Sequence, residues 1–218
     1  MKLLLTSGGL ANQSIVKALQ ELVIKPFFVL KIAFIPTAAN IEEGDKWWLI
    51  GDLNICKQLG FASVDIVDIS ALPKEIWLKR LDDADIIMVE GGNTYHLMYW
   101  FNKSGLSEIL PELLKSKVYI GISAGSLIVT PNILNSAAEK PPAEIIGDTI
   151  YDQGLALVDF MVEPHINSSY FPELTFENLE IESKKYPYSI YCLDDNSAIK
   201  IDGDKVEIIS EGEWKKFN

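Results

Sequence analysis

The most distinctive reactive pattern in this sequence is a serine placed between two glycines, in Gly121-Ile122-Ser123-Ala124-Gly125. A strand-like run, residues 118–122, precedes the serine, and an apolar stretch that can begin a helix follows it. A G-x-S-x-G sequence between a strand and a helix turns sharply, lifts the serine hydroxyl clear of the strand and sets it above a helix amino terminus. The pattern predicts that Ser123 is a nucleophile rather than part of an ordinary glycine-rich turn.

A serine hydroxyl needs a base to remove its proton, and histidine is the usual base near neutral pH. The chain has two histidines. His165 follows the strand-like residues 160–163, at the edge where α/β sites lie, whereas His96 sits inside a helical segment. We therefore expect His165 to be the base, and His96 to be a helix residue packed near the site or facing solvent.

The base in turn needs an acidic partner that holds its tautomer and stabilises the imidazolium. The residues themselves leave this partner open, because no spacing rule chooses among carboxylates on an irregular loop. Between serine and histidine the chain offers Glu139, Glu144, Asp148, Asp152, Asp159 and Glu163.

Glycine-rich segments after other strands can supply the remaining polar groups. Gly91-Gly92-Asn93 follows residues 85–90, so its backbone N–H groups can approach a substrate oxygen and, with the amide of Ala124, form an oxyanion hole. The alternative is a plain turn with Asn93 or Thr94 capping the next helix. Residues 7–9 and 36–40 also follow strands and are expected to shape the pocket, while Trp47-Trp48 is expected to close it with at least one tryptophan in the core.

Short apolar runs that alternate with helical segments must position these residues. The runs are residues 2–6, 31–36, 63–67, 85–90, 118–122 and 160–163, and the helical segments are 14–23, 43–59, 94–101 and 106–115. Apolar strands alternating with helices predict an α/β fold, with a mostly parallel sheet covered by helices on both faces. After His165 the pattern predicts a polar helix at 175–185, strands near 189–193, 198–201 and 206–210, and a hairpin at Asp202-Gly203, which form a short antiparallel addition. We expect one domain over residues 1–218.

Composition excludes several function classes. The formal net charge of −12 disfavours nucleic-acid binding. The longest apolar runs fall far short of the ~20 residues that cross a bilayer, and three leucines near the start are too few for a signal peptide, so we expect a cytoplasmic protein. Two histidines and scattered carboxylates show no metal-ligand spacing, and we expect neither metal nor cofactor.

Several of these segments resemble the serine peptidase family that contains aspartyl dipeptidase (peptidase E) and cyanophycinase, which is related in fold to class I glutamine amidotransferases. The segments, in the family's order, are residues 4–9, 34–38, 91–94, 121–126 and 164–165. The resemblance covers most of the chain. It implies a flavodoxin-like sheet and a serine–histidine–acid triad in which Ser123 and His165 take the motif positions.

The resemblance also bears on the acid and on the substrate. In this family the acid follows the nucleophile helix, which implies Glu139, 16 residues after Ser123 (139 − 123), with Glu144 as second choice. Aspartyl dipeptidases grip the substrate's aspartate with an arginine, but this chain has only Arg80, far from the motifs. Lys184 or Lys185 is a weak replacement, because lysine lacks the bidentate fork of arginine. This departure puts strict aspartyl or cyanophycin specificity in doubt.

These observations predict a serine-type peptidase or amidase that hydrolyses small peptides, dipeptidase-like, through an acyl-enzyme on Ser123, with a homodimer as one option for its assembly. One alternative is an α/β-type esterase, although the His-Gly-Gly-Gly oxyanion loop of that class is missing. A glutaminase is disfavoured because that relative uses cysteine at the elbow. A second alternative is a catalytically silent binding domain of the same fold.

Overall fold

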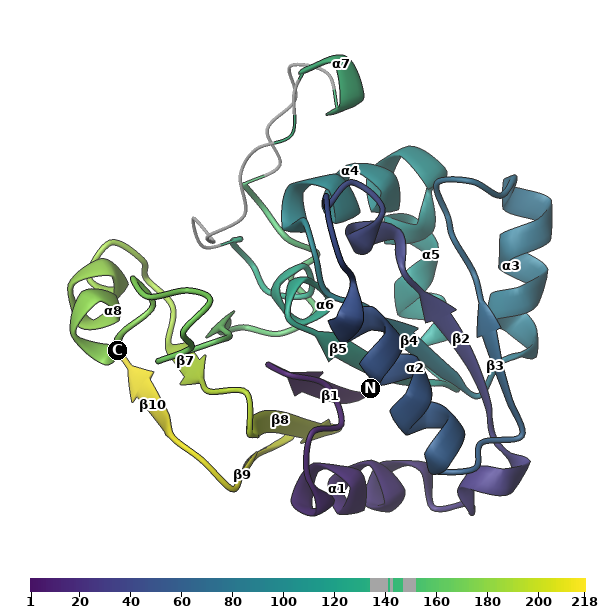
Figure 1. The fold of residues 1–218 in the computed structure, drawn as a ribbon, viewed down its shortest axis with the longest axis horizontal. Helices are drawn as coiled ribbons and strands as arrows, with labels where there is room; N and C mark the ends of the chain where they lie inside the picture. The colour runs from purple at the N-terminus through teal and green to yellow at the C-terminus, as the bar shows by residue number, and fades with distance from the viewer. Residues whose placement is uncertain (134–140, 142, 147–151) are drawn as a thin grey trace.

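The computed structural model describes residues 1–133, 141, 143–146 and 152–218, and within these its main sheet has seven strands. The spatial order is β3-β2-β4-β5-β1-β8-β9. The first five strands in this order are parallel, and β8 and β9 extend the sheet as antiparallel strands (Figure 1). The strands are β1 (Lys2–Thr6), β2 (Lys31–Ile35), β3 (Ser63–Ile66), β4 (Ile86–Val89), β5 (Val118–Ile122), β8 (Ser197–Asp202) and β9 (Lys205–Ser210).

Helices cover both faces of this sheet because its central strands are apolar on both sides. Leu3 and Leu5 of β1 point into one core, and Leu4 points into the other. The first core is completed by α3 (Lys74–Asp83), α4 (Thr94–Ser104) and α5 (Leu106–Leu113). The second is completed by α1 (Gln13–Val23) and α2 (Trp47–Gln58). The predicted α/β class, with a mostly parallel sheet between two helical layers, is confirmed.

A small mixed sheet lies beside the main one and carries the end of the chain. It contains β6 (Met161–Glu163), β7 (Ile190–Leu193) and β10 (Trp214–Phe217), with β6 parallel and β10 antiparallel to β7. Helix α8 (Phe176–Ser183) packs on it (Figure 1). The run 160–163 therefore joins this sheet instead of the main one, because β8 already occupies the free edge of β1.

The predicted hairpin is present in the antiparallel part. Asp202 of β8 is paired with Lys205 of β9, and Gly203 between them has a positive φ of 62°. The short elements are η1 (Phe27–Val29), η2 (Thr37–Ala39), α6 (Ala124–Leu127) and α7 (Ala143–Ile146). No helix in the described part of the chain is both long and apolar enough to cross a membrane.

Candidate active site

Ser123 lies in a strained turn between β5 and α6. Its φ of 47° and ψ of −107° are rarely adopted by a residue with a side chain, and such strain persists only where the surroundings enforce it. The Ser123 N–H donates to the carbonyl oxygen of Thr6, at the end of β1. A Cβ on Gly125 would overlap the carbonyl of Val89, so only glycine allows α6 to pack this closely on β4. The sequence motif therefore forms the sharp elbow that it predicts.

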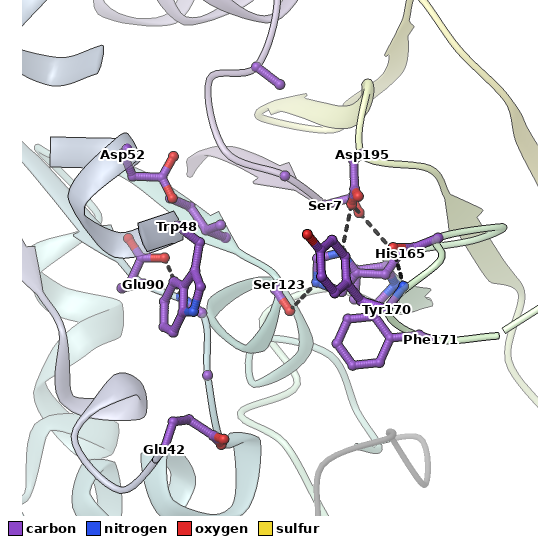
Figure 2. A pocket seen from close by; sticks show the side chains of 18 of the residues that line it. Ser7, Glu42, Trp48, Asp52, Glu90, Ser123, His165, Tyr170, Phe171 and Asp195 are labelled. Carbon is purple, nitrogen blue, oxygen red and sulfur yellow. Dashed lines mark hydrogen bonds and ion pairs between the residues drawn. The ribbon is translucent and has the colours of Figure 1, made fainter. Parts of the chain in front are cut away.

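His165 reaches this serine from the small sheet. Its Nε2 lies 2.8 Å from Ser123 Oγ, and the side chain is 20% exposed. The backbone N–H of His165 donates to Ser7 Oγ at 2.8 Å, which fixes the segment after β6 against the end of β1. The ring of Phe171 stacks on the imidazole, with ring centroids 4.9 Å apart. These contacts hold the imidazole where it can accept the serine proton (Figure 2).

The carboxylate partner of His165 is Asp195, the second residue after β7. Its Oδ1 lies 2.6 Å from His165 Nδ1 and also accepts a hydrogen bond of 2.9 Å from the Ser7 hydroxyl. Burial alone would raise the pKa of Asp195, but the hydrogen bonds from His165 and Ser7 outweigh burial, and the pKa lies below its ordinary value of 3.8. Asp195 is therefore ionised at neutral pH and can stabilise an imidazolium.

The sequence named Glu139 and Glu144 for this role. Glu139 lies outside the described residues, and Glu144 is in α7. Sequence reasoning missed Asp195 because it searched only between serine and histidine. A usable signal was present: Asp195 is a polar residue just past a predicted strand, which is the rule that singled out His165.

The segments expected to form the oxyanion hole lie beside Ser123, but some of their backbone N–H groups already donate hydrogen bonds within the protein and others do not. Gly91 packs so closely that an added Cβ would stand 3.2 Å from Ser123 Cβ, and its N–H donates to Glu90 Oε1. The N–H of Asn93 donates to the carbonyl of Ala38, while its side chain caps α4 by accepting from the His96 N–H. Among the described residues, no acceptor is found for the N–H groups of Gly92 and Ala124. In the described part of the chain these two amides therefore have no competing acceptor.

One cavity of about 760 Å³ is lined by Ser123, His165 and Asp195 together with Gly91 and Gly92. Ser7, Gly8, Trp47 and Trp48 line it, whereas residues 36–40 do not. Trp47 is 57% exposed and Trp48 is partly exposed, so the expectation that one of them is in the core is wrong. His96 is buried against Trp100 and does not line the cavity.

The cavity wall is acidic. The described residues that line it include no lysine or arginine, but they include several carboxylates: Glu42, Glu43, Asp45, Asp52, Glu90, Glu163 and Asp195. Burial raises the pKa of Glu163 to about 8. Arg80 instead forms an ion pair with Asp65, and neither Lys184 nor Lys185 reaches the cavity. Within the described ranges, no three His, Cys, Asp or Glu side chains gather into a site that could hold a metal ion.

Comparison with known proteins gives the site its context. A model of peptidase family S51 matches residues 3–209. The chain belongs to peptidase family S51. This is a family of serine peptidases, so the protein is a serine-type hydrolase, and the family decides between the peptidase and esterase classes in favour of the peptidase.

Relatives within family S51 cover most of the chain. An uncharacterized peptidase of Listeria monocytogenes is 33% identical over 80% of this chain and 83% of its own length. Peptidase E of a Nostoc species is 28% identical over 95% of this chain and 84% of its own. The solved structure of a candidate peptidase E from Listeria monocytogenes superposes with a TM-score of 0.80 at 28% identity, covering 97% of this chain and 98% of that one. A peptidase from an acI-B1 actinobacterium, at 18% identity and a TM-score of 0.65, shares the fold.

Proposed function

We propose that this peptidase hydrolyses small peptides, as a dipeptidase does, through an acyl-enzyme on Ser123, with His165 as general base and Asp195 as its carboxylate partner. The observation that carries the proposal is the unbroken chain of contacts from Ser123 Oγ through the imidazole to Asp195, at 2.8 Å and 2.6 Å. Both contacts are within hydrogen-bond distance, as a nucleophile, its base and an orienting acid require.

The reaction follows from these positions. His165 takes the hydroxyl proton as Ser123 Oγ attacks the peptide carbonyl, and the N–H groups of Gly92 and Ala124 hold the oxyanion. The imidazolium then protonates the leaving amine, which departs and leaves an ester on Ser123. A water molecule, deprotonated by His165, hydrolyses that ester and regenerates the serine. The cavity of about 760 Å³ lies within the size range of small-molecule sites, which supports short substrates.

The cytoplasmic location, the single domain and the homodimer stay predictions. Two cysteines, Cys56 and Cys192, are buried as free thiols, which fits a reducing compartment.

A panel of dipeptides and short peptides tests the proposal. Wild type should release amino-terminal residues, while Ser123→Ala should release none and should also lose reaction with a fluorophosphonate probe. Cleavage of a small ester but of no peptide would contradict the substrate class. Absence of any labelling of folded wild type would indicate a silent binding domain instead.

A further inference from the structure

Two exposed aromatic side chains meet in the wall of the cavity, and the proposed reaction uses neither of them. Trp47 is the first residue of α2, and Tyr170 lies in the segment that follows His165. Their ring centroids are 6.0 Å apart, and both residues line the cavity. Trp47 is nevertheless 57% exposed and Tyr170 is 70% exposed. Both rings therefore keep apolar surface in contact with water, which a ligand in the cavity would cover.

Backbone hydrogen bonds make the segment that carries Tyr170 a compact loop. The N–H of Ser168 donates to the carbonyl oxygen of His165, and the N–H of Phe171 donates to the carbonyl oxygen of Ser168, both at 3.1 Å. The ring of Phe171 in turn stacks on the imidazole, with ring centroids 4.9 Å apart. The loop is therefore fixed against the base, so it has little conformational freedom left to lose when a ligand binds.

Tyr170 lies on the side of Ser123 from which the leaving group departs. In the proposed reaction His165 Nε2 protonates the leaving amine, so the residue that carries this amine lies on the His165 side of the scissile bond. In Figure 2, Tyr170 and Phe171 lie on that side of the nucleophile, and Trp48 lies on the opposite side. The side chain of the leaving residue is therefore the part of a peptide that comes closest to the ring of Tyr170.

The wall of the cavity favours an apolar side chain at this place over an acidic one. Within the part of the chain that the structure describes, no lysine or arginine lines the cavity and can pair with an acidic side chain. Phe171 and Leu174, both half-buried, add apolar surface to the same wall. An apolar side chain gains free energy in proportion to the apolar area that it removes from water, and aromatic rings offer large areas.

We propose that Trp47 and Tyr170 bind the side chain of the leaving residue, so that the peptidase prefers an apolar or aromatic residue directly after the scissile bond. The two rings are close enough to act as one aromatic surface, although one comes from a helix of the main sheet and the other from the loop after the small sheet. The inference rests on the proposed peptide hydrolysis at Ser123 and names the substrate class of that site.

Steady-state hydrolysis of matched dipeptides measures this preference. Alanyl-phenylalanine and alanyl-leucine are compared with alanyl-glycine, which lacks the side chain, and with alanyl-aspartate and alanyl-lysine, which carry a charge. We expect kcat/KM of the wild type to be about 30-fold higher for alanyl-phenylalanine than for alanyl-glycine. The two charged dipeptides should be cut no faster than alanyl-glycine.

Substitutions of the two rings assign the preference to them. Trp47→Ala and Tyr170→Ala should each lower it to about fivefold or less, by slowing cleavage of alanyl-phenylalanine and not of alanyl-glycine. Tyr170→Phe keeps the ring and should keep the preference. Trp214→Ala and Phe28→Ala also remove exposed aromatic rings, but from outside the cavity, and should leave kcat/KM for both dipeptides unchanged. Thermal unfolding shows whether each variant is folded.

Isothermal titration of Ser123→Ala with the same dipeptides measures the preference without turnover. Tighter binding of alanyl-phenylalanine than of alanyl-glycine, lost when Tyr170→Ala is added, would sustain the aromatic subsite even if the wild type cut no peptide and the peptidase proposal failed. Peptide cleavage at equal kcat/KM for the apolar dipeptides and alanyl-glycine would overturn the inference and leave the peptidase proposal intact. A preference for aspartate or lysine, or one that survives both Trp47→Ala and Tyr170→Ala, would also overturn it. Neither binding nor cleavage of any dipeptide would overturn both.

Discussion

Replacing Asp195 by asparagine isolates the contribution of one charge to the proposed triad. Asparagine has nearly the same size, so the packing after β7 should be kept, but it removes the negative charge that lies 2.6 Å from His165 Nδ1. Its amide can also donate to Nδ1, which would favour the imidazole tautomer that carries a proton on Nε2. That tautomer cannot accept the Ser123 proton.

The electrostatic part of the loss follows from the distance. For unit charges 2.6 Å apart, the attraction between carboxylate and imidazolium is roughly 6 kcal/mol at an effective dielectric constant of about 20, and roughly 1.6 kcal/mol in bulk water. The Asp195 side chain is 48% exposed, so solvent screens the pair and an intermediate value of roughly 3 kcal/mol applies. That energy corresponds to a decrease of roughly 200-fold in kcat, and the tautomer effect adds to it.

The assay is steady-state hydrolysis of the best dipeptide at neutral pH by wild type, Asp195→Asn and Glu139→Gln, with thermal unfolding as the check on folding. We expect Asp195→Asn to lose at least roughly 200-fold in kcat and Glu139→Gln to stay near wild type. An Asp195→Asn variant with kcat within about tenfold of wild type would refute the electrostatic reasoning. A loss of the same size in Glu139→Gln would restore the carboxylate expected from the family resemblance.

Three further substitutions test the site and its surroundings. Ser7→Ala removes the hydroxyl that binds both Asp195 and the His165 N–H, and should lower kcat by roughly tenfold, measured with the same dipeptide. Gly91→Ala places a Cβ 3.2 Å from Ser123 Cβ and should slow fluorophosphonate labelling by roughly tenfold with little change in melting temperature. Burial raises the pKa of Glu163 from 4.5 to about 8, so the unfolded state ionises first and wild-type stability should fall as pH rises from 4.5 to 8. The full loss of stability over this pH range is roughly 5 kcal/mol. Urea unfolding of Glu163→Gln should show a stability without this pH dependence. The same pH dependence in wild type and variant would contradict this assignment.

The sequence predicted the elements whose own residues specify them. Strands 2–6 and 118–122 match β1 and β5, because such runs, apolar on both faces, form buried parallel strands. Helix α3 and strand β10 were not predicted, because each has a thin apolar pattern: α3 buries only Trp77 and Leu81, and β10 buries only Phe217. The apolar pattern of a segment predicts its secondary structure poorly wherever few of its side chains enter the core.

The reactive residues divide in the same way. The elbow at Ser123 is a local property of one strand, one turn and two glycines, so the sequence alone determined it, and His165 was within reach as one of two histidines. The partner of His165 was decided by tertiary structure. Parallel pairing of β6 and β7 aligns Glu163 with Cys192 and brings the segments that follow them together, although His165 and Asp195 are 30 residues apart.

The same limit applies to Asp52 and Glu90, two carboxyl groups that line the cavity. Glu90 follows β4 and Asp52 lies within α2, and nothing in the spacing of the two indicates that they meet. They meet because α2 packs on the face of the sheet that carries Met88 of β4, where Cys56 contacts Met88, and burial raises the pKa of both carboxyl groups. The sequence thus determined the fold class and the elbow at Ser123, which depend on neighbours along the chain. Contacts between distant segments, and the desolvation that they cause, decided which carboxylate partners His165 and which acidic groups line the cavity.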